Sequence, residues 1–469
     1  MFSKLLSFAA LSFFSLLLAN PATSHSVSFN EADYDPSHVV TKDFLVLGGG
    51  ASGTYAAVRL KDHDQSIVLI ERNNRLGGHT RTYIDPETGG TSDIGVLIYQ
   101  NFTTTINFFK RFDIPLSTFV GNGPFESKYA DFATGEAMPN YTLPDFLTGF
   151  KKYFETLTQY PYLEYGWNLT YPVPDDLLMP FGDYVTKYGL EDAALMIFEY
   201  AQSQGNILDQ PTIYVAKYFG VSNGDAFVNG YLSTARRNNS ELYSKALESL
   251  GSDVLLRSHI LSLKRSDSGV RAVVSTPTGN KLIKAKKLVS SIPPKLSHLT
   301  GWDLTNKELQ LFGQFNNSAY WTALVTDTGL DNNITYINVQ PNAVLNIPRL
   351  PEGYVVSPTG SIKDVFHIYY GSPSSLPEHQ IRKAMIKDVN VVQKLQGVSM
   401  RKPKFLILEQ HVPFQCAVTP ELIRERFYEK LYSLQGKTST FWTGAAWHTH
   451  DSAMLWRFTE GLLPTFLGQ

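Results

Sequence analysis

A short apolar segment followed by three spaced glycines constrains the fold of this chain more than any other feature. Residues 43–47 (DFLVL) form a mainly apolar run, which is typical of a parallel strand buried on both faces. Gly48, Gly50 and Gly53 then satisfy the pattern G-x-G-x-x-G, and residues 54–60 place apolar side chains at helical spacing. Glycines are needed because the backbone must turn tightly and lie against a pyrophosphate, whose charge faces the first amides of the helix.

The segment after this helix adds a second strand and an acidic residue. Residues 67–70 (IVLI) predict another buried strand, which ends at Glu71. An acid about 20 positions beyond the glycines accepts hydrogen bonds from the ribose of an adenosine. A carboxylate would repel a 2′-phosphate, so Glu71 disfavours NADP. The whole unit predicts a dinucleotide site in which Ala51 and Ser52 lie beside the glycines.

The composition excludes several other functions. Lys+Arg total 41 and Asp+Glu total 43, which argues against a nucleic-acid binder because such a protein needs a basic face. Charged residues make up 18% and aromatic residues 13%, so the chain can bury a large core and still line an apolar cavity. The single cysteine, Cys416, excludes a disulfide framework and a cysteine-rich metal site, and we expect it to be buried.

Residues 1–24 have the pattern of a secretory signal peptide. Lys4 precedes an uncharged apolar run over residues 5–19, and small residues at 22–24 offer a cleavage site. The run is shorter than the roughly 20 apolar residues of a membrane span, so no stable span is expected, although an uncleaved signal anchor is the alternative. We therefore expect the secretory pathway, with secretion or residence in the ER or vacuole lumen. Sequons for glycosylation occur at Asn101, Asn140, Asn168, Asn238, Asn316 and Asn333.

The residues after Glu71 resemble those of a known superfamily. Arg72 directly follows the acid, and Gly77 and Gly78 form a second glycine pair. This arrangement resembles the FAD-dependent amine oxidase superfamily, in which the segment runs under the diphosphate towards the flavin. Glycines allow close approach of the backbone, and nearby cations offset the diphosphate charge.

His79 departs from the superfamily pattern, because relatives usually carry arginine directly after the double glycine. One interpretation is a hydrogen bond from His79 to the cofactor or to the backbone. The other is a covalent link to the flavin, since imidazole is nucleophilic, and His448 and His450 are alternative attachment sites. None of these histidines has the carboxylate or cysteine partners of a metal site, so no metal is expected.

Three further parts of the chain extend the resemblance. Residues 93–95 (DIG), ending at Gly95, resemble the point where the superfamily passes the flavin edge. Ile260 lies in a predicted strand and matches the position whose backbone holds the adenine. Near the C-terminus, residues 441–446 predict a strand and a tight turn at Gly444.

A final helix is predicted after this turn, with Asp451 or Ser452 as its N-cap. In the superfamily this helix N-terminus stabilises negative charge on the reduced flavin. Ala445 stands where many relatives have glutamate, so one contact to the cofactor is expected to be missing.

The ending of the chain, residues 427–464, is similar to one fungal branch of the superfamily, as are residues 180–184 (PFGDY). That branch is the β-cyclopiazonate dehydrogenase family, FAD oxidoreductases of secondary metabolism. The resemblance implies an enzyme that takes a hydride from a large apolar small-molecule substrate, polycyclic or prenylated, and drives oxidative cyclisation, with O2 as electron acceptor. It identifies no catalytic residue.

The resemblance also implies the fold class, α/β with a Rossmann-type FAD-binding domain and an inserted α+β substrate domain. The FAD-binding domain is expected to be discontinuous, with parts at 41–130, 235–300 and 430–469. The substrate domain is expected at 131–234 and 301–429.

Two other functions stay open at this point. An amine or polyamine oxidase is disfavoured because residues 319–325 contain no lysine, whereas classical amine oxidases carry one near the flavin on the corresponding strand. A non-catalytic flavin-binding protein is the second alternative, because binding motifs and catalytic groups are separate features.

Overall fold

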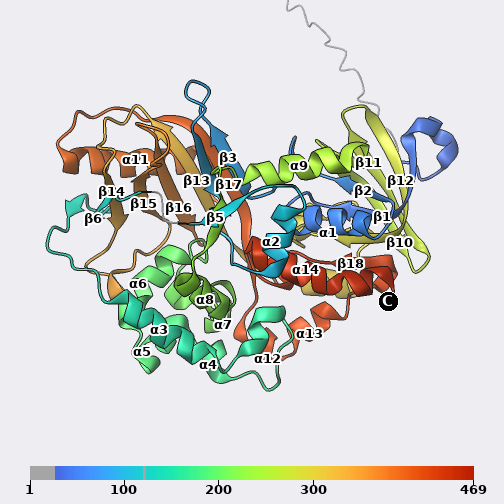
Figure 1. The fold of residues 1–469 in the computed structure, drawn as a ribbon. Coiled ribbons are helices and arrows are strands. Elements are labelled where there is room, and N and C mark those ends of the chain that lie inside the picture. The colour runs from blue at the N-terminus through green and yellow to red at the C-terminus, as the bar shows by residue number, and fades with distance from the viewer. Residues whose placement is uncertain (1–26, 120–122) are drawn as a thin grey trace, which may run out of the picture.

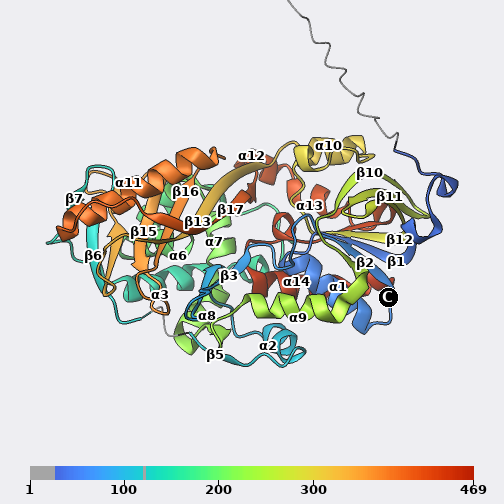
Figure 2. The same cartoon turned by 90° about the horizontal axis from the view of Figure 1, so that it is seen from above.

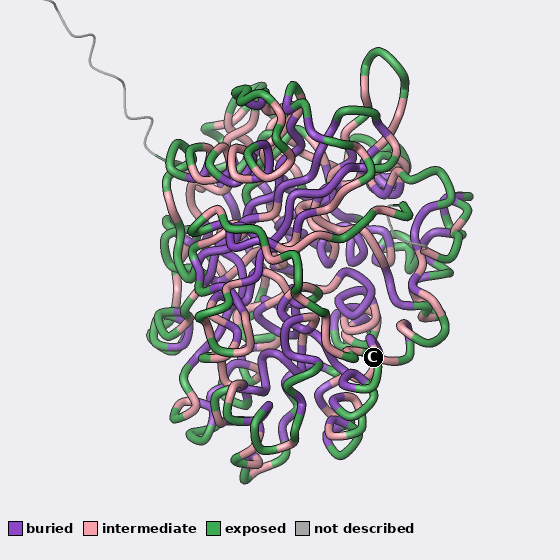
Figure 3. The backbone as a smooth tube through the Cα atoms, turned by 90° about the vertical axis from the view of Figure 1, so that its left-hand side faces the viewer, coloured by how far each residue is buried: buried purple, intermediate pink, exposed green. Residues whose placement is uncertain are grey.

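The computed structural model describes residues 27–119 and 123–469, so the predicted signal peptide at 1–24 lies outside the described residues. Two seven-stranded sheets lie side by side, and a group of helices lies below them in the view of Figure 1. Figure 3 shows that the buried stretches of the backbone run through the interior, whereas the exposed stretches lie mainly at the outside. No helix in the described ranges is long and apolar enough to cross a membrane.

The first sheet is assembled from three separated parts of the chain. Its order is β10-β11-β12-β1-β2-β9, and β18 also pairs with β12. The strands are β1 (Val39–Leu47), β2 (Ile67–Ile70), β9 (Val254–Leu255), β10 (His259–Ser266), β11 (Gly269–Thr276), β12 (Gly279–Ser290) and β18 (Thr440–Trp442). β1, β2, β9, β12 and β18 run parallel, so their carboxyl ends meet at one edge, where α/β sheets bind ligands.

Both faces of this sheet are buried, which explains the continuous apolar run in β1. Phe44 and Val46 face a core shared with α1 (Ala51–Asp62), α2 (Thr103–Lys110), α9 (Ser240–Leu250) and α14 (Ser452–Leu467). Leu45 and Leu47 face the opposite core, which β10 and β11 help to form. Figure 2 shows α1, α9 and α14 lying along one side of the sheet.

The second sheet has the order β17-β13-β16-β15-β14-β6-β7. Its strands are β6 (Glu126–Asp131), β7 (Glu136–Ala137), β13 (Asn316–Thr326), β14 (Ile334–Asn338), β15 (Glu352–Pro358), β16 (Phe366–Ser372) and β17 (Lys404–Ala417). One face packs against α11 (Glu378–Gln396) through an apolar core that includes Trp321, Ala323 and Ile368. Since side chains alternate along a strand, Tyr320 and Tyr369 point to the other face.

Short strands join the two large sheets. β3 (Thr80–Ile84) pairs with β4 (Thr91–Gly95), and β5 (Leu116–Thr118) pairs with β8 (Leu232–Thr234). Ile94 of β4 packs against Leu324 of β13, so the segment after the glycine pair contacts the second sheet directly.

The remaining helices enclose an aromatic core. They are α3 (Phe146–Leu157), α4 (Asp175–Leu178), α5 (Phe181–Tyr188), α6 (Glu191–Tyr200), α7 (Thr212–Tyr218), α8 (Val221–Asn229), α10 (Asn306–Phe312), α12 (Pro420–Arg424) and α13 (Phe427–Tyr432). Cys416 lies at the edge of this core, buried and free, and burial raises the pKa of its thiol to about 12.

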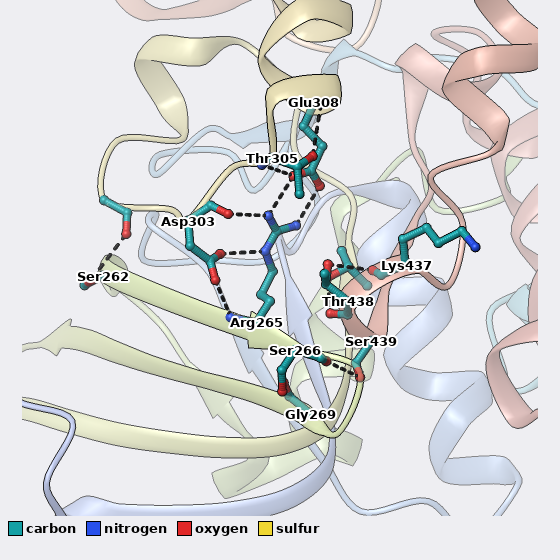
Figure 4. Close-up of polar contacts among 12 residues, drawn as sticks. Ser262, Arg265, Ser266, Gly269, Asp303, Thr305, Glu308, Lys437, Thr438 and Ser439 are labelled. Atoms are coloured by element: carbon teal, nitrogen blue, oxygen red, sulfur yellow. Dashed lines mark hydrogen bonds and ion pairs between the residues drawn. The ribbon is translucent and has the colours of Figure 1, made fainter.

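A buried ion-pair network connects the first sheet to α10 (Figure 4). The guanidinium of Arg265 in β10 donates to Asp303 at 2.8 Å and to both carboxylate oxygens of Glu308 at 2.7 and 2.8 Å. Glu308 also completes a capping box with Thr305 at the start of α10. The Arg265 and Glu308 side chains are 1% and 5% exposed, so this pair is shielded from solvent, whereas Asp303 lies at the surface with 34% of its side chain exposed.

Strand pairing places two domain boundaries differently from the sequence-based expectation. The expected boundary at residue 130 falls inside β6, which pairs with β14 and therefore belongs to the second sheet. The expected boundary at residue 430 falls inside α13. Residues 130 and 430 lie inside continuous elements rather than in loops. The hydrophobic pattern of the sequence does not show to which sheet β6 belongs or against which layer α13 packs.

Candidate FAD site

The glycine loop lies between the end of β1 and the start of α1. Gly48 adopts φ 95°, a conformation that favours glycine, and Gly50 is the N-cap of α1. A Cβ atom at Gly53 would lie 1.9 Å from the carbonyl oxygen of Gly48, so the helix can follow the turn this closely only without a side chain. Ala51 and Ser52 belong to the first turn of α1, which begins three residues before the segment 54–60 that the sequence pattern marked as helical.

Glu71 follows β2 and is 7% exposed. Its carboxylate accepts hydrogen bonds from the backbone N–H groups of Gly49 and Asn73, each at 2.7 Å. Ser258, two residues before Ile260, donates its backbone N–H to the carbonyl of Glu71 at 2.9 Å. The segment that leads to Ile260 therefore runs beside the acid, although Ile260 itself lies within β10.

The second glycine pair packs directly against the first glycine motif. The backbone N–H of Gly77 donates to the carbonyl of Gly49 at 2.8 Å, and a Cβ at Gly78 would lie 2.9 Å from the Cα of Gly50. Arg72 is exposed, whereas Arg75 is half-buried and donates to the carbonyls of Gly78 at 3.0 Å and Thr80 at 2.8 Å. Arg75 was not among the predicted site residues, because it falls between the acid and the glycines without a motif of its own.

These features fit the diphosphate of a dinucleotide. A Cβ atom added at Gly50 would have Gly78 Cα, 3.9 Å away, as its nearest neighbour among the described residues, so the loop faces open space. The Ser52 hydroxyl is buried and has no hydrogen-bond partner within the described part of the chain. The start of the twelve-residue helix α1 directs its backbone amides to the same place.

His79 belongs to an aromatic cluster that joins the segment after the glycine pair to β17 and to the C-terminal segment. Its ring centroid lies 4.4 Å from that of His411, 5.6 Å from that of Phe414 and 6.2 Å from that of His450. Burial, with the nearby Arg72 and Arg75 charges, lowers the pKa of His79 to about 4. Burial and His79 lower the pKa of His450 to about 3, so these imidazoles are neutral at physiological pH.

The predicted flavin-edge segment lies against this cluster. Gly95 has φ 91°, and a Cβ there would lie 2.1 Å from the carbonyl oxygen of His79 and 3.3 Å from the His411 ring. Asp93 accepts hydrogen bonds from the Thr82 hydroxyl and from the backbone N–H of Asn239 at 2.9 Å. Burial outweighs these bonds and raises the pKa of Asp93 to about 6.

The C-terminal segment reaches the same edge of the first sheet. Gly444 has φ 95°, and a Cβ there would lie 2.8 Å from the carbonyl oxygen of Ser291, just beyond β12. Asp451 is the N-cap of α14, accepts the backbone N–H of Met454 at 2.9 Å, and accepts the side-chain amide of Gln100 at 2.7 Å. Ser452 is the first residue of α14.

His448 is held by a lysine that no motif in the sequence singles out. Nζ of Lys217 lies 2.7 Å from Nδ1 of His448 and donates to the carbonyls of Leu163 at 2.6 Å and Gly166 at 2.7 Å. Lys217 is 2% exposed, and its partners come from separate segments, so only the folded chain reveals the cluster.

The comparisons with known proteins agree with this geometry. The family model described as "NAD(P)-binding Rossmann-like domain" matches residues 46–121. The chain is 36% identical to the FAD-dependent oxidoreductase oblC of Cochliobolus heterostrophus, over 97% of this chain and 98% of that protein. It is 34% identical to beta-cyclopiazonate dehydrogenase of Aspergillus flavus, over 90% of this chain and 92% of that protein.

The chain belongs to this family of FAD-dependent oxidoreductases. Solved structures support the same fold. A fatty acid isomerase from P. acnes matches with a TM-score of 0.73 at 19% identity, over 91% of this chain and 98% of that chain. Putrescine oxidase bound to putrescine matches with a TM-score of 0.65 at 15% identity, over 92% and 100%. The chain thus shares the α/β fold of these two structures.

Proposed function

We propose that this oxidoreductase takes a hydride from a C–H bond of a large, mainly apolar secondary metabolite and drives oxidative cyclisation of the product. The observation that carries the proposal is the face of the second sheet that meets the candidate FAD site. Tyr320, Thr322 and Tyr369 lie on it, next to His411 and Phe414. Such a face suits an aromatic or prenylated substrate, with few charged groups to recognise ionic ones.

The cofactor residues proposed for FAD follow from the site geometry. Bound FAD supplies the hydride acceptor. The glycine loop and the start of α1 would hold its diphosphate, Glu71 its adenosine ribose, and the α14 N-terminus the pyrimidine edge of the flavin. The full set is Gly48, Gly50, Ala51, Ser52, Gly53, Glu71, Arg72, Gly77, Gly78, His79, Gly95, Ile260, Gly444, Asp451 and Ser452.

The substrate class rests on the relatives as well as on the site. One relative is named for β-cyclopiazonate, and we propose a substrate of comparable size and apolar character for this chain. We propose O2 as the electron acceptor. An amine substrate is disfavoured because residues 319–325 of β13, the stretch in which amine oxidases are expected to carry a lysine near the flavin, contain none.

A covalent histidine link to the flavin is a separate proposal. His79 and His450 are neutral, which leaves a ring nitrogen able to act as a nucleophile. His448 is less suited, because its Nδ1 is engaged by Lys217 at 2.7 Å. Colour that stays in the acid-precipitated pellet of the wild type and leaves that of His79→Ala would assign the link to His79.

We also propose that the protein is secreted or resides in the lumen of the ER or vacuole, and that it is glycosylated. Five sequon asparagines are exposed, namely Asn101, Asn140, Asn168, Asn316 and Asn333. Asn238 is half-buried, and its side-chain oxygen is enclosed. Secretion into the medium of an expressing fungus, with loss of residues 1–24, would test the route.

The test of function is anaerobic reduction of the purified holoenzyme. Two visible flavin bands establish the cofactor, and bleaching by β-cyclopiazonate or by prenylated phenols without a nicotinamide supports direct hydride transfer. Ammonia release from simple amines would instead indicate an amine oxidase. A flavin that no metabolite extract reduces would indicate a non-catalytic binder.

A further inference from the structure

Glu199, in α6, is a buried acid that none of the roles above uses. Its Oε1 atom is enclosed and has no hydrogen-bond partner among the described residues. Burial raises the pKa of its carboxyl to about 8, and a hydrogen bond from Gln202 only partly offsets this effect. An acid in this environment exchanges a proton near physiological pH, which suits acid–base chemistry.

The charge of this carboxyl acts on four tyrosines from different elements. They are Tyr129 of β6, Tyr200 of α6, Tyr320 of β13 and Tyr354 of β15. Burial is the main cause that raises the pKa of each phenol, and the Glu199 charge adds to it in all four. Among the described residues, no basic side chain is a cause of the pKa shift of Glu199. The acid is therefore not part of an ion pair, and its titratable neighbours are phenols.

A short series of contacts connects Glu199 to the candidate flavin site. Gln202 bonds to Glu199 and accepts the hydroxyl hydrogen of Tyr320. The Tyr320 ring centroid lies 5.7 Å from that of His411 and 6.1 Å from that of Phe414. The Phe414 ring is in turn 5.6 Å from that of His79, which follows the second glycine pair. These contacts link Glu199, through Gln202 and Tyr320, to the aromatic cluster of the candidate flavin site.

Several side chains in this region keep part of their surface accessible. They are Glu199, Gln202, Tyr320, Tyr369 and His450, each of which is half-buried. Burial is nevertheless the largest cause of the pKa shifts of Glu199, Tyr320, Tyr369 and His450, so protein surrounds these groups without covering them completely. Their accessible surface is therefore available to a substrate that lies against the second sheet.

We propose that Glu199 is the acid–base residue of the substrate site and accepts the proton that the substrate loses during oxidation. The proposal rests on the proposed function. In the step, the substrate C–H bond breaks and its hydrogen leaves with both electrons to FAD. An O–H or N–H bond of the same substrate breaks as well, and its proton forms a new O–H bond on Glu199. The electron pair left behind forms the new double bond of the product, so atoms and charge balance.

This assignment narrows the substrate class. The molecule must carry an ionisable O–H or N–H group conjugated to the C–H bond that is oxidised, as in a phenol, an enol or an indole. Gln202 and Tyr320 act as positioning residues, because the amide orients the carboxyl and the phenol orients the amide.

The test compares Glu199→Gln with Glu191→Gln, a control at an exposed position of the same helix. With β-cyclopiazonate or a prenylated phenol as probe, we expect the anaerobic rate of flavin reduction in the wild type to rise with pH through about 8. We expect Glu199→Gln to lose this rise and to be slower by at least about 100-fold, and Glu191→Gln to match the wild type. A Glu199→Gln profile that matches the wild type overturns the proposal.

An infrared titration separates failure of this inference from failure of the proposed function. Between about pH 6 and pH 10, the resting holoenzyme should show the C=O band of a protonated carboxylic acid that disappears near pH 8 and is absent in Glu199→Gln. Without that band the inference fails, whatever the probes do. If the band is present but no probe reduces the wild-type flavin, the proposed function fails. The assignment of Glu199 is then tested by binding alone, because a phenol probe that contacts this acid must shift the band. A band that does not shift overturns the assignment.

Discussion

The carboxylate of Glu71 lies 2.7 Å from the backbone nitrogen of Gly49, so the acid after β2 is bonded to the glycine loop after β1. Glu71 therefore shapes the loop in addition to its proposed contact with ribose. We expect Glu71→Gln to weaken FAD binding by about 10–100-fold, since a hydrogen bond to a charged group is worth roughly 1.5–3 kcal/mol. Flavin fluorescence titration of the apoprotein measures this, with the exposed Glu87→Gln as control. Equal affinities in the two variants would contradict the role.

Two glycines in helices should respond to alanine in opposite ways. At Gly53 a Cβ would collide with the Gly48 carbonyl at 1.9 Å, whereas at Gly461 in α14 it would meet no described atom within 4 Å. We expect Gly53→Ala to abolish flavin binding and Gly461→Ala to raise the free energy of unfolding by about 0.5–1 kcal/mol, because alanine loses less backbone entropy in a helix. Flavin content and chemical denaturation measure the two effects. Normal flavin content in Gly53→Ala would refute the packing argument.

Removing one partner of the buried network in Figure 4 should be costly. Arg265→Met leaves Glu308, whose side chain is 5% exposed, without its counter-ion. The expected loss is about 3–5 kcal/mol of unfolding free energy, and the double variant Arg265→Met/Glu308→Leu should recover part of it, because no buried charge of that pair is then left uncompensated. Thermal and urea unfolding give the values. A double variant less stable than Arg265→Met would contradict this expectation and would show that the capping bonds between Glu308 and Thr305 outweigh the cost of the unpaired charge.

The buried histidines should make the protein acid-sensitive. Burial lowers the pKa of His367 from 6.5 to about 4. Between these values the unfolded chain binds more protons than the native one, so native stability falls as pH decreases through this range. Between pH 6.5 and pH 4, the unfolding free energy of His367→Gln should fall by about 3 kcal/mol less than that of the exposed control His379→Gln. Urea unfolding at several pH values tests this, and parallel curves for both variants would speak against it.

Glycosylation should distinguish Asn238 from the other sequons. Ser240, the third residue of that sequon, bonds through its hydroxyl to the backbone N–H of Thr82, and Asn238 bonds through its own N–H to Thr234. We expect glycans at Asn101, Asn140, Asn168, Asn316 and Asn333 but little at Asn238. Mass spectrometry of glycopeptides from protein expressed in a fungus measures the occupancy. Full occupancy at Asn238 would mean that transfer precedes formation of the β3 contact.

The sequence predicts those parts of the site whose geometry is determined by a few consecutive residues. The turn at Gly48 and the N-cap at Asp451 each depend on a few consecutive residues, and the structure has both where the pattern placed them, whereas α1 begins at Ala51, three residues before the predicted helical segment. The final helix extends to Leu467, and its later part packs against α1, where Arg59 bonds to Glu460.

Other parts could not be predicted because they depend on contacts between distant segments. Glu199 is unusual only because Tyr129, Tyr320 and Tyr354 converge on it from three strands. Lys217 and Arg75 likewise acquire their roles from carbonyl groups that tertiary structure brings to them. A single sequence carries no signal for such convergence, since each residue is ordinary in its own segment.

The pairing of β18 with β12 has a consequence for biosynthesis. β1 and β12 precede the strand at Thr440–Trp442 and the helix that begins at Ser452, so the ribosome makes the glycine loop before the segments that complete the candidate flavin site. A nascent chain that has not reached residue 440 therefore lacks the α14 N-terminus that is proposed to face the flavin. We expect a variant truncated before residue 440 to purify without the yellow colour of bound flavin.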